Sequence, residues 1–153
     1  MNTRRRSAWL KTIILIATCV IVTVASGQSD LNSSPPARCP TAAQLQPLHL
    51  YGLWRADFEG LAPSATLRFE RHPELAGSVR GGVNRDGIQT RLAGDVDQGD
   101  VTLEESQDGQ RISATWIGTV VEQSCGKEIR GTWHNAFNQA AHPFVLRKLP
   151  GWQ

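Results

Sequence analysis

The sequence predicts an all-β protein built as an eight-stranded, antiparallel, up-and-down β-barrel. From residue 50 onward, apolar and polar side chains alternate with a period of two in eight short runs, as in half-buried strands. Turns that contain Gly, Asn or Asp separate these runs, and no crossover helix is indicated between them. Consecutive hairpins form a meander, and closing the meander into a barrel removes its two exposed edges. A two-sheet sandwich is the alternative architecture.

Residues 1–27 are predicted to be a signal peptide. Three arginines at positions 4–6 precede an apolar stretch at 12–25, and the small residues Ala25, Ser26 and Gly27 follow. From Thr12 to Gly27 there are only 16 residues, fewer than the roughly 20 that a spanning helix requires. Cleavage is therefore favoured over an uncleaved anchor, which would be the chain's only attachment to a membrane. We expect an exported protein, periplasmic or secreted after cleavage.

The charge distribution argues against a nucleic-acid partner. Four of the 16 basic residues lie within 1–27, so 12 basic residues face 14 acidic ones from Gln28 onward. Those 12 basic residues are scattered singly, whereas a nucleic-acid binder concentrates its basic residues on one surface. No nucleic-acid binding is expected.

Residues 28–49 are predicted to form an N-terminal leg that precedes the barrel domain at 50–149. The Ser- and Pro-rich part, 28–38, has no apolar period and is predicted to be flexible. Thr41 is placed to cap one short helical turn at 42–45, which Pro47 ends. Residues 150–153 form a short C-terminal tail.

Export leaves Cys39 and Cys125 as the two cysteines of the mature chain. Two thiols in an oxidising compartment most simply pair, and their separation is too large for a CxxC metal or redox motif. A Cys39–Cys125 disulfide would tie the leg to the barrel.

The predicted strands follow the alternation, and the turns follow Gly and Asp. The strongest hairpin signals are the Asp-Gly pairs at 86–87 and 108–109, with Gln98-Gly99 as a further turn. The strands are predicted at 50–58, 65–70, 78–84, 88–97, 101–106, 112–122, 129–135 and 144–148.

Alternation assigns most of the aromatic side chains to the barrel interior. We predict an aromatic-lined pocket for a small, flat or apolar ligand, with indole N–H groups orienting it. The alternative is a packed core, since side chains can fill a small eight-stranded barrel. Inward glycines at 81, 94 and 118 favour a pocket, although inward Gly94, Gly118 and Gly131 also fit tight bends or a close approach of neighbouring strands. The predicted ligand-binding residues are Trp54, Phe69, Trp116 and Trp133.

The chain resembles the calycin group, the lipocalin-like and avidin-like eight-stranded barrels. The resemblance rests on Gly52-Leu53-Trp54 in the first strand, on residues 129–133 and on residues 143–148, and covers about the last hundred residues. In that group a basic residue from near the last strand packs over the Trp of the G-x-W motif at the closed end. The resemblance assigns that role to Arg147 or Arg130.

The layout is also similar to that of periplasmic inhibitors of bacterial metalloproteases. These have a signal peptide, an N-terminal leg, a G-x-W opening and one disulfide, and residues 40–45 precede Gly52-Leu53-Trp54 in a similar arrangement. The resemblance implies that the leg enters a protease cleft.

No constellation of catalytic or metal-ligating residues is evident. The four histidines lack the spacing of a metal clamp, and no serine lies in a nucleophile elbow. The acidic pair Glu104-Glu105 is interpreted as a solvated edge. We expect no enzymatic activity, no metal and no cofactor.

The sequence therefore predicts an exported, monomeric binding protein for a small apolar ligand. The alternatives are a protein-directed inhibitor that uses the leg or the loops of the open barrel end, and an accessory subunit of an envelope complex.

Overall fold

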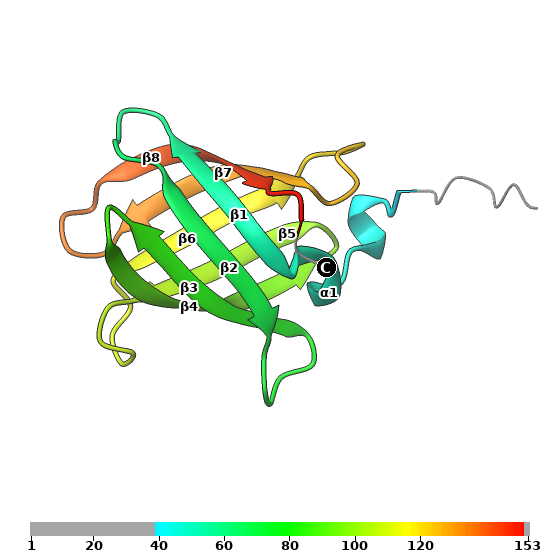
Figure 1. Ribbon diagram of the computed structural model, residues 1–153, viewed down its shortest axis with the longest axis horizontal. Coiled ribbons are helices and arrows are strands. Elements are labelled where there is room, and N and C mark those ends of the chain that lie inside the picture. Colours follow the sequence, from blue (N-terminus) through cyan, green and yellow to red (C-terminus); the bar gives the residue numbers. More distant parts are fainter. Residues whose placement is uncertain (1–38, 152–153) are drawn as a thin grey trace, which may run out of the picture. The chain divides into compact units, whose positions relative to one another are not determined.

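The computed structural model describes residues 39–151, which form a closed antiparallel barrel of eight strands in sequential order (Figure 1). The predicted all-β, up-and-down barrel is confirmed, and the sandwich is excluded. The strands are β1 (Gly52–Phe58), β2 (Ala65–Arg71), β3 (Ser78–Arg85), β4 (Ile88–Asp97), β5 (Asp100–Ser106), β6 (Ala114–Val120), β7 (Glu128–Asn135) and β8 (Ala141–Lys148).

The barrel closes between its first and last strands. β1 pairs with β2 on one side and with β8 on the other, where Trp54 lies opposite Lys148 and Phe58 lies opposite Phe144. Each strand therefore has two hydrogen-bonded neighbours, and neither β1 nor β8 remains an edge.

The predicted tight turns have the backbone that type I′ hairpins require. Asp86 and Gly87 both have positive φ, 53° and 83°, and so do Gln98 and Gly99, with 49° and 92°. Two residues therefore reverse the chain between β3 and β4 and between β4 and β5. These turns set the register of three consecutive strands.

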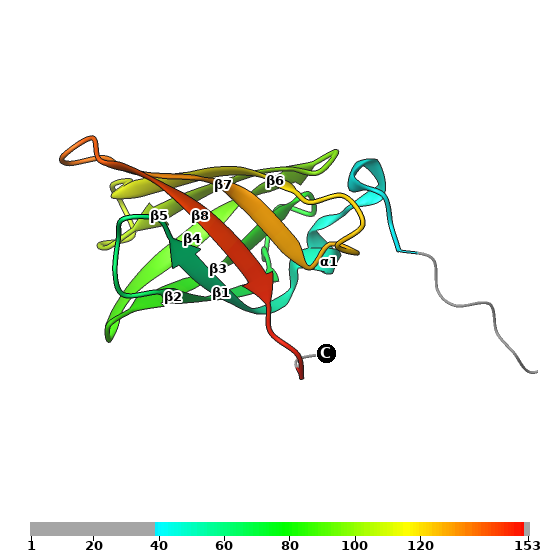
Figure 2. The same cartoon turned by 90° about the horizontal axis from the view of Figure 1, so that it is seen from above.

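The two ends of the barrel differ. A 3₁₀ turn, η1 (Ala42–Gln44), and a single helical turn, α1 (Pro47–Leu50), lie at one end (Figures 1 and 2). The connections β1–β2, β3–β4, β5–β6 and β7–β8 lie at the opposite end, called here the distal end. The expected turn near 42–45 is confirmed, whereas α1 was not predicted because four residues carry no helical period.

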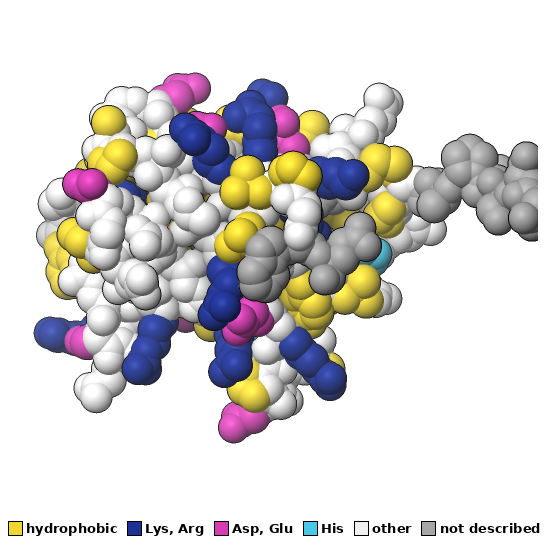
Figure 3. Space-filling model, viewed as in Figure 1, with side chains coloured by type: hydrophobic (Ala, Val, Ile, Leu, Met, Phe, Trp, Pro, Cys, Tyr) yellow, Lys and Arg dark blue, Asp and Glu magenta, His cyan; other side chains and the backbone are white. Residues whose placement is uncertain are grey.

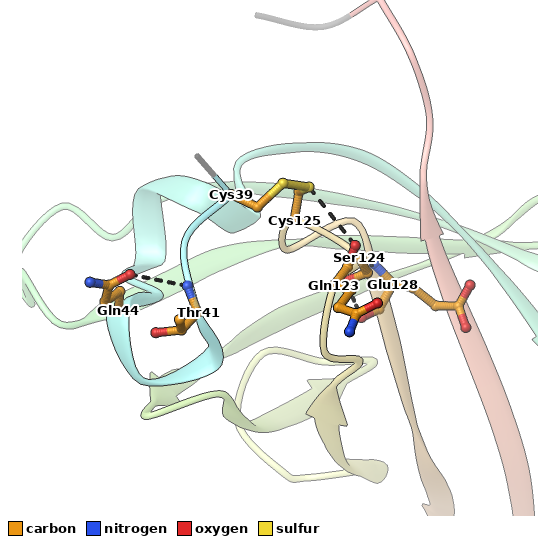
Figure 4. Close-up of a disulfide and its surroundings, with 7 residues drawn as sticks. All are labelled: Cys39, Thr41, Gln44, Gln123, Ser124, Cys125 and Glu128. Atoms are coloured by element: carbon orange, nitrogen blue, oxygen red, sulfur yellow. Dashed lines mark hydrogen bonds between the residues drawn. A yellow bond between two sulfur atoms is a disulfide. The ribbon is translucent and has the colours of Figure 1, made fainter. Parts of the chain in front are cut away.

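The segment that carries η1 and α1 is packed onto the barrel and covalently tied to it. Leu45 and Leu50 belong to the hydrophobic core, with 5% and 0% of their surface exposed. The predicted disulfide is confirmed, because Cys39 is bonded to Cys125 in the β6–β7 connection (Figure 4). The predicted signal peptide and the Ser- and Pro-rich leg lie outside the described residues.

Inward glycines mark places where strand backbones approach each other. A Cβ on Gly94 would overlap the carbonyl oxygen of Thr102, and one on Gly131 would overlap that of Ile117. Gly81 and Gly118 meet the carbonyl groups of Arg68 and Arg130 in the same way. The expected close approach of neighbouring strands is confirmed at these glycines. The glycines do not provide room for a ligand, because neighbouring backbone occupies that space.

Several details differ from the sequence-based expectations. Residues 50–51 belong to α1 and its end rather than to β1, and β6 begins at Ala114 rather than at Ile112. Alternation in the predicted strands 88–97 and 112–122 places Ile88 and Ile112 on the inward face, but they are 66% and 44% exposed. Ile88 is the first residue of β4, and Ile112 precedes β6, so both lie at the distal end.

The basic residue over the G-x-W indole is Lys148, not Arg147 or Arg130. Lys148 shares the inward face of β8 with Phe144 and Leu146, and its Nζ lies near the Trp54 ring. Arg147 and Arg130 are on the outer face, where both form ion pairs with Glu128. The alternation in β8 therefore decides which residue covers the tryptophan.

Candidate functional site

The predicted ligand-binding residues fall into two groups inside the barrel. Trp54 and Phe69 lie at the α1 end and pack edge to face, with ring centroids 5.9 Å apart. Both are buried, and the Trp54 indole donates a 2.7 Å hydrogen bond to the carbonyl of Leu50 in α1. This pair forms the floor of the barrel interior, meaning its end beneath α1, and α1 covers that end from outside.

Trp116 and Trp133 lie in the distal half of the barrel. They are cross-strand partners in β6 and β7, with ring centroids 6.4 Å apart and planes inclined by 72°. Phe58 packs 5.4 Å from Trp116 and 6.1 Å from Trp133, and Phe144 packs 5.1 Å from Trp116. We call these four side chains, Phe58, Trp116, Trp133 and Phe144, the distal aromatic cluster.

The distal aromatic cluster surrounds one buried carboxylate. Glu105 of β5 is only 6% exposed, and its Oε2 accepts hydrogen bonds from Nε1 of Trp116 and of Trp133, each 3.2 Å long. Its Oε1 accepts a 2.8 Å hydrogen bond from the hydroxyl of Thr90 in β4. Three side-chain donors thus stabilise the charge of Glu105 inside the barrel.

A guanidinium group lies across the same end of the barrel. Arg85, the last residue of β3, places its Cζ 4.8 Å from the ring centroid of Phe58 and 4.7 Å from that of Trp133. Its Nε and Nη2 are buried, and neither has a hydrogen-bond partner within residues 39–151. Burial lowers the pKa of Arg85, and the charge of Glu105 partly offsets that effect.

Polar and aromatic side chains therefore occupy different sides of the distal interior. Arg85, Thr90 and Glu105 come from three adjacent strands, β3, β4 and β5, whereas the aromatic rings come from β6, β7, β8 and β1. This arrangement combines an apolar wall with a donor group, the combination that small-molecule sites use.

Sequence analysis missed the polar half of this site. Glu105 was expected to be solvated, but it follows Val101 and Leu103 on the inward face of β5 and is buried. The alternation that identified the inward leucine and valine is the signal that could have found the carboxylate. Arg85 was assigned to a turn, whereas it is the inward-facing last residue of β3.

Exposed apolar side chains surround the distal end. Ile88, Ile112 and Phe137 lie in or beside three of its four connections and are 66%, 44% and 68% exposed. Phe58, Arg85 and His142 are each partly exposed beside them. The distal end is consequently the less covered end of the barrel interior, because η1 and α1 close the other one.

Two grooves lie on the outside of the barrel. One, of about 1040 Å³, follows the outer face of β2 to β5 and carries Arg68, Arg80 and Arg91 together with Glu70 and Glu104. The other, of about 530 Å³, lies between α1 and β2 beside Leu48 and Lys148. On the face in Figure 3, Lys and Arg side chains lie apart, among apolar and acidic ones.

Within residues 39–151, no group of three or more His, Cys, Asp and Glu side chains is arranged to hold a metal ion. His134 and His142 are neighbours across the last hairpin but point to opposite faces, His142 against Trp133. Over the same residues, no helix has the length and apolar character needed to cross a membrane.

Comparison of the chain with protein-family models and with curated protein sequences finds no match.

Proposed function

We propose that the chain is an exported, non-catalytic binding protein that takes a small, flat, apolar ligand at the distal end of its barrel. The observation that carries the proposal is the distal aromatic cluster, which reaches the less covered end through the partly exposed Phe58. The Cys39–Cys125 disulfide is typical of oxidising compartments and fits export.

The ring faces, rather than the indole N–H groups, provide the contact with the ligand. Glu105 already accepts hydrogen bonds from the indole N–H groups of Trp116 and Trp133. The backbone carbonyl of Leu50 accepts the hydrogen bond from the indole N–H of Trp54. A ligand would therefore enter beside Arg85, which lies over the rings of Phe58 and Trp133, and pack against the apolar rings. Trp54 and Phe69 form the floor of the interior and support this site from below.

The test is a titration with N-phenyl-1-naphthylamine, a neutral and flat apolar probe. Binding at the distal end should increase the probe's fluorescence and quench tryptophan emission. The variant Phe58→Ala should bind the probe with an affinity about tenfold or more lower, as measured by both changes, because a buried aromatic contact is lost. Ile117→Ala, on the outer face of β6 with 55% exposure, is the control and should bind as the wild type does. No response of the wild type, or an equal response of Phe58→Ala, would contradict the proposal.

The second candidate is a protein-directed inhibitor that uses the distal loops. Three exposed apolar side chains, Ile88, Ile112 and Phe137, favour it, since such residues commonly contact protein partners. Their combined replacement by Ser should abolish inhibition of an envelope metalloprotease and leave probe binding intact. If inhibition instead requires residues 28–38, deleting that segment should abolish it without changing the fold.

A further inference from the structure

Arg85 has hydrogen-bonding capacity that the protein does not use. Its guanidinium lies over the rings of Phe58 and Trp133, and its buried Nε and Nη2 have no partner among the described residues. A buried donor without an acceptor is destabilising, and more so when the donor is charged. The position is thus costly unless a further acceptor is present.

Glu105 does not serve as that acceptor. Its two oxygens take hydrogen bonds from Thr90, Trp116 and Trp133, and no ion pair within 4.0 Å joins it to Arg85 among the described residues. The interior therefore contains one carboxylate with three donors and one guanidinium with free donors. An anionic oxygen is the strongest acceptor for a guanidinium, and a ligand that supplies one would satisfy these donors.

We infer that the ligand of the distal site is an aromatic or otherwise flat apolar carboxylate, with its carboxylate bound by Arg85 and its apolar body packed against the distal aromatic cluster. This inference rests on the proposed function, because it adds the charged group to a ligand whose apolar part that function requires. Arg85 is suited to the role, since cation–π contacts with Phe58 and Trp133 hold its guanidinium group, and its Nε and Nη2 have no partner among the described residues.

The charge of Glu105 limits which anions the site accepts. A second negative charge in the interior is repelled by Glu105, but the donors on both oxygens of that carboxylate reduce the repulsion. A singly charged carboxylate close to Arg85 and away from Glu105 satisfies both requirements. A ligand with two or more negative charges does not.

The test compares two compounds that share one apolar body, 2-naphthoate and 2-naphthamide, by isothermal titration calorimetry on the disulfide-bonded protein at pH 7. The wild type should bind the carboxylate about tenfold or more tightly than the amide, because charge-assisted hydrogen bonds exceed neutral ones. Arg85→Met keeps a side chain that stacks on the rings but removes the charge and the donors. It should bind both compounds with affinities that differ by less than about twofold.

Arg80→Met is the matched control, because Arg80 is on the outer face of the same strand and should retain the preference for the carboxylate. Arg85→Lys, which keeps the charge but loses the planar group, should retain only part of the preference for the carboxylate. The wild-type comparison needs no variant, so it decides the matter even if Arg85→Met does not fold.

The possible failures are distinguishable. Equal affinity of the wild type for the two compounds, or an undiminished preference in Arg85→Met, would overturn the assignment of Arg85 and leave the apolar site standing. Absence of binding of both compounds to the wild type would overturn this inference and the proposed function together.

Discussion

Lys148 of β8 covers the indole of Trp54 in the neighbouring strand β1, with its Nζ 5.8 Å from the ring centroid. The same Nζ donates a 2.7 Å hydrogen bond to the carbonyl of His49, in α1. One side chain of the last strand therefore contacts both the first strand and the helix that precedes it. This relationship joins the last strand to α1 and β1, which are far from it in the sequence.

Lys148 should make the free energy of unfolding depend on pH in the alkaline range. Burial, and then the charge of Lys127, lower the pKa of Lys148, so the folded state binds this proton more weakly than the unfolded chain does. The free energy of unfolding should therefore rise with pH between the lowered pKa and the unfolded value of about 10.4. Urea unfolding across that interval should show this rise for the wild type and not for Lys148→Met. Lys127→Met, the control, should keep the rise but shift it to higher pH.

Glu105 should be essential for the folded interior. Glu105→Ala leaves the buried indole N–H groups of Trp116 and Trp133 without their acceptor, at about 1–3 kcal/mol each, or roughly 2–6 kcal/mol in total. Denaturant unfolding measures the loss. Glu104→Ala changes the adjacent, outward-facing carboxylate and should alter stability by less than about 0.5 kcal/mol. Equal effects of the two substitutions would contradict the role of Glu105.

The disulfide should stabilise the covered end of the barrel. Cys39 and Cys125 are separated by 86 positions, and a loop of this size contributes roughly 4–5 kcal/mol in the chain-entropy model. The double variant Cys39→Ser/Cys125→Ser should lose that amount in urea unfolding under non-reducing conditions. Adding a reductant should destabilise the wild type to the same level and leave the variant unchanged. A reductant effect on the variant would show that something other than this bond responds.

Gly94 should tolerate no side chain. In Gly94→Ala the new Cβ would overlap the carbonyl oxygen of Thr102 in β5, so the β4–β5 pairing must shift, at about 1–3 kcal/mol or more. Gly77→Ala is the control, because no atom lies within 4 Å of the Cβ position there. Thermal unfolding of the two variants should differ by several degrees, and similar midpoints would show that β4 and β5 can separate without cost.

Asp108 should hold the β5–β6 connection in acid. The backbone N–H groups of Arg111 and Gln110 and the Arg111 side chain donate to its carboxylate, which lowers the pKa well below the ordinary value for Asp. The stabilisation is present above the unfolded pKa and is lost as pH falls through the lower, folded pKa. NMR titration should find Asp108 still ionised at pH values below the ordinary pKa of an aspartate. Asp108→Ala should increase amide exchange in residues 109–111.

The strands and tight turns were predictable because their signals are local. Alternation needs only six to eight residues, and Asp86-Gly87 determines its own backbone conformation. The helical turn α1 was not predictable from periodicity, since Pro47–Leu50 completes scarcely one turn.

The candidate site was predictable only in its aromatic half. Trp116 and Trp133 are apolar and alternate with polar neighbours, so both hydropathy and period place them inside. For Glu105, Arg85 and Lys148 these two criteria disagree, because alternation places a charged side chain inside. The structure follows alternation at all three, where indole donors, aromatic rings and a backbone carbonyl compensate for the burial of charge.

The pairing of β1 with β8 also constrains how the chain reaches its folded state. As the first strand to be synthesised, β1 can pair with β2 at once, but its other side stays unpaired until Ala141–Lys148 is available. Until then its free amides and carbonyls are open to association with other chains. Pairings this distant in sequence slow folding, so the nascent chain has a long interval in which a holding chaperone would protect it.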